Sequence, residues 1–300
     1  MKSNTIIPLL VTLLVTIGCS SNKEYNYGIE YMHGNVKSVD LSVFKAKTKF
    51  GEVLEDEWFG SLSYSFNTNH QIEQLKYYDD ELKGSLLGVL KFKYDSYNNL
   101  QTINFYDSEG DLEGVHECQY SSGRIKKCDK HTYYKIYDGS MEEECRTDIF
   151  SLSNKQMTVK TDNYFDKFIY DIMFDNKGKV LQATYTDVET KKSRTTLVER
   201  DKNGNLLKTT NTYDGMFIFD FVHPYFIYTI GPASVFYFGS YFEQDENVYL
   251  YEYEFDEHKN WIKRIVYEND KEHPQYIYKR SIEYYEGSAY TYKAAGCLPK

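Results

Sequence analysis

One short unit recurs along this chain and limits what the chain can fold into. Three residues, usually apolar, stand at alternate positions, an Asp or Asn follows at once, and an apolar residue returns five positions later. Successive side chains of a strand point to opposite faces, so this alternation predicts a strand with one buried face. Copies of the unit end at Asn67, Asp95, Asp175, Asp201 and Asp256, and Asp107 begins a similar turn without the preceding strand pattern.

The Asp or Asn that ends each strand predicts a tight turn, because its side chain accepts hydrogen bonds from nearby backbone N–H groups. Gly178 and Gly204 stand three residues after their Asp, where a type I turn with a G1 bulge requires a positive φ, and Asn98 can supply the same conformation. Two pairs of successive copies are 28 and 26 residues apart, which fits two strands and two turns. The sequence therefore predicts an all-β fold, an antiparallel meander of repeated β-hairpins.

Composition agrees with this fold class and excludes one class of partner. The chain holds 31 Tyr and 18 Phe but only 5 Pro, and aromatic residues suit a half-buried pleated surface. A sheet with one apolar face needs cover, so we expect this sheet to curl or close. With 45 Asp and Glu against 35 Lys and Arg, the chain lacks the basic excess of nucleic-acid-binding proteins, and we expect no nucleic-acid partner.

Three copies of the unit resemble a known family. The segments 94–100, 174–180 and 255–261 are similar to the YD (Rhs-type) repeat, which reads aromatic-Asp-x-x-Gly-Asn/Arg-apolar. The resemblance implies continuous antiparallel sheet. Two of the three segments lack the Gly, and irregular stretches separate the copies. Large Rhs proteins enclose a toxin, but this chain shows no separate C-terminal effector, so that role is not carried over.

The N-terminal residues predict a compartment. Lys2 precedes the apolar run Ile6–Ile17, which is too short to span a bilayer comfortably. Thr16-Ile17-Gly18-Cys19 then places small or apolar residues before a cysteine, and this segment resembles a bacterial lipobox. The alternatives are an uncleaved anchor helix, for which polar residues begin too soon, and an ordinary secretory signal, which needs no cysteine here.

The lipobox resemblance implies a domain organisation. Residues 1–18 would be a lipoprotein signal peptide, and 19–28 the lipidated N-terminus and tether, with acyl chains on Cys19. Ser20 rather than Asp after the cysteine implies an outer-membrane destination, although the side of that membrane is not readable. Residues 29–300 are predicted to form a single β-hairpin-repeat domain with an aromatic-rich insertion at about 215–242.

Four further cysteines permit two disulfides, as expected of an exported protein. Cys118 and Cys128 flank the turn residues 121–123, so they either lie opposite each other on a hairpin or are offset by one residue and point to opposite faces. Cys118 and Cys128 are the disulfide candidates, and Cys145 and Cys297 are the other two cysteines. Zinc is the competing interpretation, but the spacings are irregular and no histidine pair is near, so we expect no metal.

The insertion 215–242 differs from the rest of the chain. Asp220 is its single formal charge, and Pro224, Gly231 and Pro232 divide it into pieces too short for a membrane helix. We expect these pieces to pack in the core. If they instead lined an aromatic surface, they would form the binding site of a lipid, glycan or other small molecule.

No motif predicts catalysis or a cofactor. The chain has no G-x-S-x-G elbow, P-loop or dinucleotide-binding glycine fingerprint. Its seven histidines are scattered, and those beside turns, His70 and His258, are expected to be solvated. The acidic run Glu142–Glu144 is expected to be a solvated face. Asp107–Glu113 invites a calcium interpretation, but a plain hairpin turn accounts for it. Trp261 is the best candidate for stacking on a sugar, although its repeat position predicts the core.

A membrane-spanning barrel would also alternate apolar and polar residues. The chain, however, ends Ala-Ala-Gly-Cys-Leu-Pro-Lys rather than on an aromatic residue, and Lys and Glu recur within the predicted strands. The sequence therefore predicts an envelope lipoprotein, held at the membrane through its N-terminal lipid. It would act as a non-catalytic interaction or structural module with a protein or envelope-component partner. The alternative is a ligand-binding lipoprotein with an aromatic-lined sheet interior.

Overall fold

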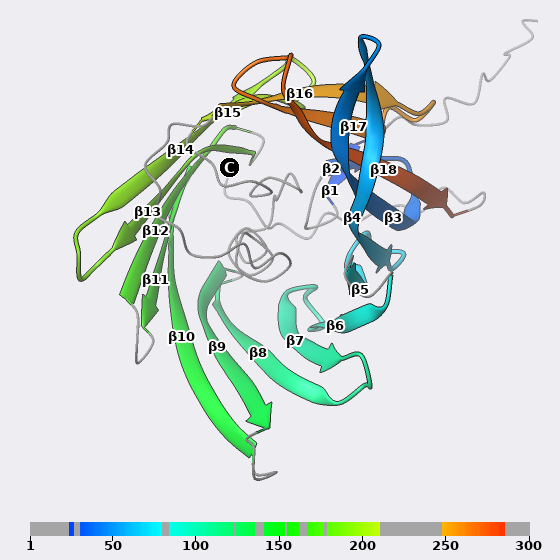
Figure 1. Ribbon diagram of the computed structural model, residues 1–300. Coiled ribbons are helices and arrows are strands. Elements are labelled where there is room, and N and C mark those ends of the chain that lie inside the picture. The colour runs from blue at the N-terminus through cyan, green and yellow to red at the C-terminus, as the bar shows by residue number, and fades with distance from the viewer. Residues whose placement is uncertain are drawn as a thin grey trace, which may run out of the picture.

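The protein is all-β in the part of the chain that its structure describes (Figure 1). The computed structural model describes residues 24–26, 31–79, 84–122, 124–135, 141–153, 155–162, 167–176, 179–210 and 248–285. Cys19, the insertion 215–242 and Cys297 lie outside these ranges. Within the ranges, no helix is long and apolar enough to cross a membrane.

Strands β3 to β18 form one closed barrel, in which each strand pairs antiparallel with its neighbours in sequence and β18 closes against β3. The strands are β1 (Glu24–Asn26), β2 (Tyr31–His33), β3 (Val36–Lys49), β4 (Glu52–Phe66), β5 (Ile72–Asp79), β6 (Leu86–Tyr94), β7 (Leu100–Asp107), β8 (Leu112–Ser121), β9 (Arg124–Lys135), β10 (Met141–Leu152), β11 (Gln156–Asp162), β12 (Lys167–Phe174), β13 (Val180–Asp187), β14 (Ser193–Arg200), β15 (Leu206–Thr210), β16 (Val248–Phe255), β17 (Trp261–Glu268) and β18 (Pro274–Tyr284). The predicted antiparallel meander is confirmed, and its sheet closes.

The repeated unit forms the hairpins that the sequence predicts. In the copy at Asp95, the carboxylate Oδ1 accepts hydrogen bonds from the backbone N–H groups of Tyr97 and Asn99 at 2.8 and 2.9 Å. Asn98 takes a φ of 64°. The register shifts beside the turn, between Lys93 and Tyr94, as a bulge requires. The copy at Asp201 repeats the same bonds, with Gly204 at a φ of 89°.

The apolar residues of the repeat form the core. Leu41 on β3 is paired in register with Leu62 on β4, and both, with Tyr64, are at most 1% exposed. In a closed barrel, side chains converge on the concave face, so these buried positions face inward. The alternate positions face outward and are largely polar, as the ion pair between Lys37 and Glu283 on β3 and β18 illustrates. On β3 and β4 the barrel is therefore largely apolar inside and largely polar outside.

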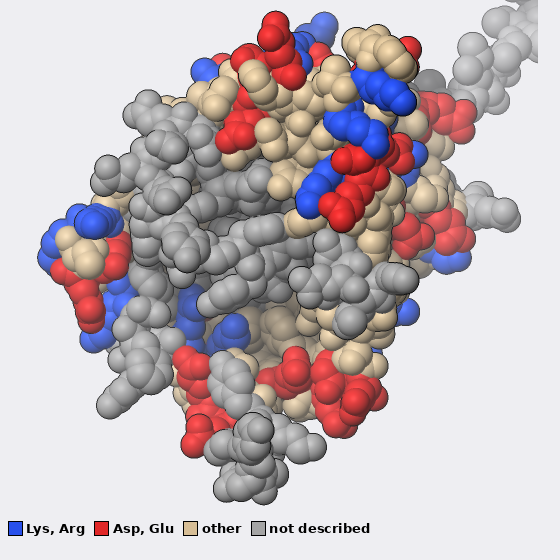
Figure 2. All heavy atoms as spheres, in the orientation of Figure 1, with Lys and Arg blue, Asp and Glu red and all other residues tan. Residues whose placement is uncertain are grey.

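The structure departs from the sequence-based expectation in three places. β3 and β4 continue past a bulge at Val43 as a projecting hairpin, whose tip Phe50–Gly51 has two positive φ angles, 55° and 82°. The hairpin of β3 and β4 projects from the barrel in Figure 1, and in Figure 2 Lys and Glu side chains cluster on it. Strand β1 lies within the predicted tether. His70, expected to be solvated, is buried, at the end of a turn closed by the hydrogen bond from its N–H to the carbonyl of Asn67.

Candidate functional site

Charged side chains that pair with one another gather on one part of the outer face of the barrel. On β16 to β18 and on β3 and β4, long charged side chains pair across strands. Lys279 on β18 contacts Glu55 on β4 at 3.0 Å, and Lys263 on β17 contacts Glu254 on β16 at 2.7 Å. These side chains are exposed, so each pair contributes little to stability, about 0–1 kcal/mol. The sector presents a hydrated, charge-balanced surface.

A second sector of the outer face exposes large apolar side chains. Met173 on β12, Leu181 on β13, Leu197 on β14 and Leu207 on β15 are each between 41% and 48% exposed. We call these four residues the apolar row. Met173 and Leu197 are joined in register through Gln182, which pairs with both.

Two members of the apolar row owe their position to the repeat. Leu181 and Leu207 each follow the first buried residue of the returning strand, Val180 and Leu206. The register passes from Val180 directly to Gln182, so Leu181 is the extra residue of a bulge, and Leu207 has the same place in the next copy. A bulge re-aims a side chain. Here two bulges turn leucines to solvent at neighbouring points of the barrel rim.

The N-terminal hairpin β1–β2 contacts the barrel beside the β16–β17 turn. Met32 is 1% exposed and packs with the core, and His33 is bonded to Asn260 in the β16–β17 turn. Tyr284, at the end of β18, donates to Asp256 in that turn at 2.5 Å and accepts from Asn260 at 2.8 Å. Burial and the Asp256 carboxylate raise the pKa of Tyr284. The segment that leads back towards Cys19 therefore meets the barrel beside this turn.

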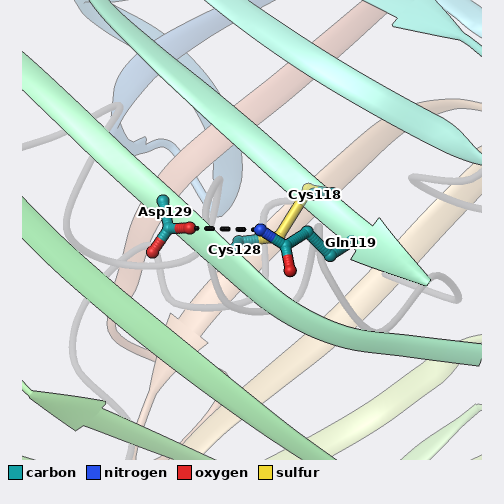
Figure 3. The surroundings of a disulfide bond; sticks show 4 residues. All are labelled: Cys118, Gln119, Cys128 and Asp129. Atoms are coloured by element: carbon teal, nitrogen blue, oxygen red, sulfur yellow. Dashed lines mark hydrogen bonds between the residues drawn. A yellow bond between two sulfur atoms is a disulfide. The ribbon is translucent and has the colours of Figure 1, made fainter. Parts of the chain in front are cut away.

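Cys118 and Cys128 are paired directly opposite each other on β8 and β9, with their Cα atoms 4.2 Å apart, and a disulfide joins them (Figure 3). The one-residue offset left open by the sequence is absent from the register. The disulfide faces the core, where Cys128 is 1% exposed. The next residues, Gln119 and Asp129, meet at 3.5 Å on the outer face (Figure 3).

His131, Glu143 and Cys145 meet on the outer face of β9 and β10. His131 Nδ1 lies 2.6 Å from Glu143 Oε1, and Cys145 Sγ lies 3.4 Å from that nitrogen and 3.5 Å from that oxygen. Cys145 is paired in register with His131. Partial burial and the hydrogen bond to Glu143 raise the pKa of the Cys145 thiol, whereas the bond to His131 lowers the pKa of Glu143.

This cluster is not apparent from the sequence, in which His131 is one of seven scattered histidines and Glu143 lies in a short acidic run. The missing signal is the cross-strand register, which sets His131 opposite Cys145 although 14 residues separate them. Among the described cysteines, Cys145 is the one without a disulfide.

The other predicted chemical positions have structural roles. Asp107 accepts from the N–H groups of Glu109 and Asp111 at 2.9 and 2.8 Å, as a hairpin turn requires, although the three carboxylates lie close together. Trp261 is 8% exposed, with the guanidinium of Arg280 at 3.3 Å and that of Arg264 at 4.8 Å from its ring centroid. Since cations already cover this ring, Trp261 belongs to the core.

No protein-family model and no curated protein matches this chain. Among solved structures, it is similar to a porin-like protein from Bacteroides vulgatus (14% identity, covering 82% of this chain and 98% of that chain, TM-score 0.42). It is also similar to a porin-like protein from Bacteroides uniformis (10% identity, 83% and 98%, TM-score 0.44). A third similarity is to the complex TcdB2-TccC3 (6% identity, 76% and 13%, TM-score 0.28). These similarities are weak, and no function is carried over from them.

Proposed function

We propose that this protein is an envelope lipoprotein whose barrel, tethered to the outer membrane through Cys19, is a non-catalytic interaction module that binds another protein. The observation that carries this proposal is the apolar row. It exposes four large apolar side chains on the outer face, whereas the inner face buries its own. Large apolar side chains gathered on one part of a surface mark sites where partners bind.

The distribution of polarity supports a barrel that lies in water beside the membrane. A membrane-spanning barrel presents an apolar band of about 25 Å to lipid and keeps a polar interior. Here the arrangement is reversed, since Leu41 and Leu62 face inward and ion pairs such as Lys37–Glu283 face outward. A lipid on Cys19 would then supply the membrane attachment.

The chemistry of the outer cluster supports a non-catalytic role. A cysteine nucleophile needs a lowered pKa so that the thiolate is present. In this cluster, Glu143 accepts a hydrogen bond from Cys145, and the pKa of that thiol is raised. The group therefore resembles a Cys–His–Glu nucleophilic site in composition but favours the protonated thiol.

The anchor and the interaction are tested separately. Replacing Cys19 with Ala should move the protein from the membrane fraction to the soluble fraction, and continued tight membrane association would refute the lipid anchor. For the interaction, a photo-crosslinking residue at Leu197 should capture a defined protein in intact cells. The same probe at Lys263, in the charged sector, is the matched control.

The crosslink must also depend on the apolar row. Leu181→Glu, on the neighbouring strand, should reduce capture from Leu197 at least tenfold without changing the amount of protein. Equal capture from Leu197 and Lys263, or capture unaffected by Leu181→Glu, would contradict an interaction through this row.

The alternative, a ligand-binding lipoprotein, rests on the insertion 215–242, which lies outside the described residues. One described feature favours an anionic ligand: Arg264 and Arg280 face inward among Tyr251, Tyr278 and Trp261. Native mass spectrometry of protein purified from its own envelope tests this alternative, since a retained small molecule would support it.

A further inference from the structure

We propose that Cys145, His131 and Glu143 form a binding site for a divalent transition metal of the zinc class on the outer face of β9 and β10. The sequence predicted no metal, because the spacing of these residues along the chain follows no known ligand motif. The antiparallel register supplies what the spacing does not. It places Cys145 opposite His131, and Glu143, two residues before Cys145, projects from the same face.

The three donor atoms suit this class of metal. Thiolate sulfur, imidazole nitrogen and carboxylate oxygen are its usual protein ligands, at about 2.3, 2.0 and 2.1 Å. A tetrahedron with those bonds has sulfur–nitrogen and sulfur–oxygen edges of about 3.6 Å. The distances from Cys145 Sγ to His131 Nδ1 and to Glu143 Oε1 are 3.4 and 3.5 Å. Two of the three edges are therefore already close to the bound geometry.

The third edge, between His131 Nδ1 and Glu143 Oε1, is shorter because these two atoms are hydrogen-bonded to each other. Nδ1 of His131 and Oε1 of Glu143 are 2.6 Å apart, whereas a metal between them requires about 3.4 Å. Both side chains are partly exposed, at 31% and 48%, so they can separate without disturbing the core. The exposure also leaves a fourth position for water, as in zinc sites with three protein ligands.

Binding is balanced in protons. The Cys145 thiol releases its proton to solvent and binds as thiolate. Neutral His131, whose Nδ1 proton bonds Glu143 in the free protein, changes to the tautomer with its proton on Nε2 by exchange with solvent, and it binds the metal through the Nδ1 lone pair that this frees. Glu143 is already a carboxylate. One dication thus replaces one proton and the His131–Glu143 hydrogen bond, and affinity rises with pH because the thiol must ionise.

The surroundings of the site hold its ligands in place. Asp129 lies two residues before His131 on β9 and accepts a hydrogen bond from Thr147 on β10 at 2.8 Å. Lys127 contacts the same carboxylate at 2.8 Å. The bond between Thr147 and Asp129 joins β10 to β9 next to the cluster and supports the register that keeps the donor atoms together.

The test uses the full mature protein, purified in detergent, stripped of metal and titrated with Co²⁺ and then Zn²⁺. Co²⁺ should produce a thiolate-to-metal absorption band in the near ultraviolet, which Zn²⁺ then displaces. Cys145→Ser should abolish the band, and His131→Ala should weaken Zn²⁺ binding at least tenfold. Glu109→Gln is the matched control, because it alters an exposed carboxylate cluster that contains no sulfur or nitrogen donor.

Three results would overturn the proposal. They are absence of the band in the wild-type chain, a band of equal strength in Cys145→Ser, and a Cys145–Cys297 disulfide found by mass spectrometry under non-reducing conditions. Unfolding midpoints of the variants are measured alongside. Glu143→Gln provides a second test that keeps both stronger ligands, and it should weaken Zn²⁺ binding without abolishing the cobalt band.

Discussion

Asn260 binds the backbone of His33 from 227 residues away, through both atoms of its side-chain amide. Oδ1 accepts from the His33 N–H at 2.7 Å, and Nδ2 donates to the His33 carbonyl at 2.8 Å. The side-chain amide of Asn260 therefore forms with the His33 backbone the two hydrogen bonds that a neighbouring strand would otherwise form. In the repeat copies at Asp95 and Asp201, the corresponding residues Asn99 and Asn205 instead donate to the Asp of their own turn at 3.0 Å. Asn260 alone among these three is directed to the N-terminal hairpin.

Asn260→Ala is therefore expected to loosen the N-terminal hairpin. It leaves the N–H and carbonyl of His33 without this partner, which costs about 1–3 kcal/mol where those groups stay buried. Amide hydrogen exchange at residues 31–33 should accelerate at least tenfold. Asn205→Ala, which removes the same side chain from an equivalent turn, should leave that exchange unchanged. Equal acceleration in both variants would show that the hairpin is held in another way.

Lys259 offers a test of the turn chemistry. It takes a φ of 72° at the position where other copies use glycine. A left-handed conformation costs a residue with a side chain about 1–2 kcal/mol, and the greater chain entropy of unfolded glycine offsets about 0.5–1 kcal/mol of the gain. Lys259→Gly should therefore raise the free energy of unfolding by about 0.5–1 kcal/mol in urea denaturation.

Two control variants test whether strain at Lys259 is the cause of the expected stabilisation. Glu257→Gly alters the same turn at a residue without a positive φ and should lower the free energy of unfolding. Gly204→Ala introduces the strain that Lys259→Gly removes, since Gly204 has a φ of 89° and its added Cβ would lie 2.5 Å from Lys179 Nζ. If Lys259→Gly and Glu257→Gly destabilise equally, backbone strain at Lys259 is not the reason.

Local chemistry made the hairpins predictable from sequence. The end of β6 at Tyr94 and the start of β7 at Leu100 follow from Asp95 between them. Its carboxylate organises the turn by accepting hydrogen bonds from backbone N–H groups no more than four residues away. The same reasoning limited the pairing of Cys118 and Cys128 to two possible registers. Only the pairing along the whole of β8 and β9 decides between these registers.

The sequence predicted that the sheet curls or closes, but not which strands meet at the closure, and it did not predict the cluster of His131, Glu143 and Cys145. Both features depend on residues that lie far apart in the chain. β18 pairs with β3 through contacts such as Arg280 with Leu41, which no turn connects. His131 and Cys145 come together because β9 and β10 are paired in one register. Long-range pairing, rather than composition, creates both features.

The disulfide should contribute measurably to stability. Cys118 and Cys128 close a loop of 10 residues, and the chain-entropy model gives about 2.5–3 kcal/mol for a loop of this size. The double variant Cys118→Ala/Cys128→Ala should lose about that much free energy of unfolding. Reductant should destabilise the wild-type chain and leave the double variant unaffected. A similar response of both proteins to reductant would contradict this assignment.

His116 should make the barrel sensitive to mild acid. It is 2% exposed, stacks on Phe105 with ring centroids 4.4 Å apart, and is paired in register with Lys130. Burial, with the positive charges of Lys130 and Arg146, holds the pKa of His116 well below its usual value. The unfolded chain therefore binds a proton that the folded chain does not. The stability due to neutral His116 is complete above the unfolded pKa of about 6.5 and is lost as pH falls below it.

Urea denaturation between about pH 7.5 and pH 5 measures this effect, since one such histidine changes the free energy of unfolding by at most about 1.4 kcal/mol per pH unit. His116→Gln removes the titrating group and should flatten the pH dependence in this range, even if it lowers stability at neutral pH. His273→Gln, which replaces an exposed imidazole bonded to Asp270, is the control and should keep the wild-type slope. A wild-type slope in His116→Gln would place the acid sensitivity in another group.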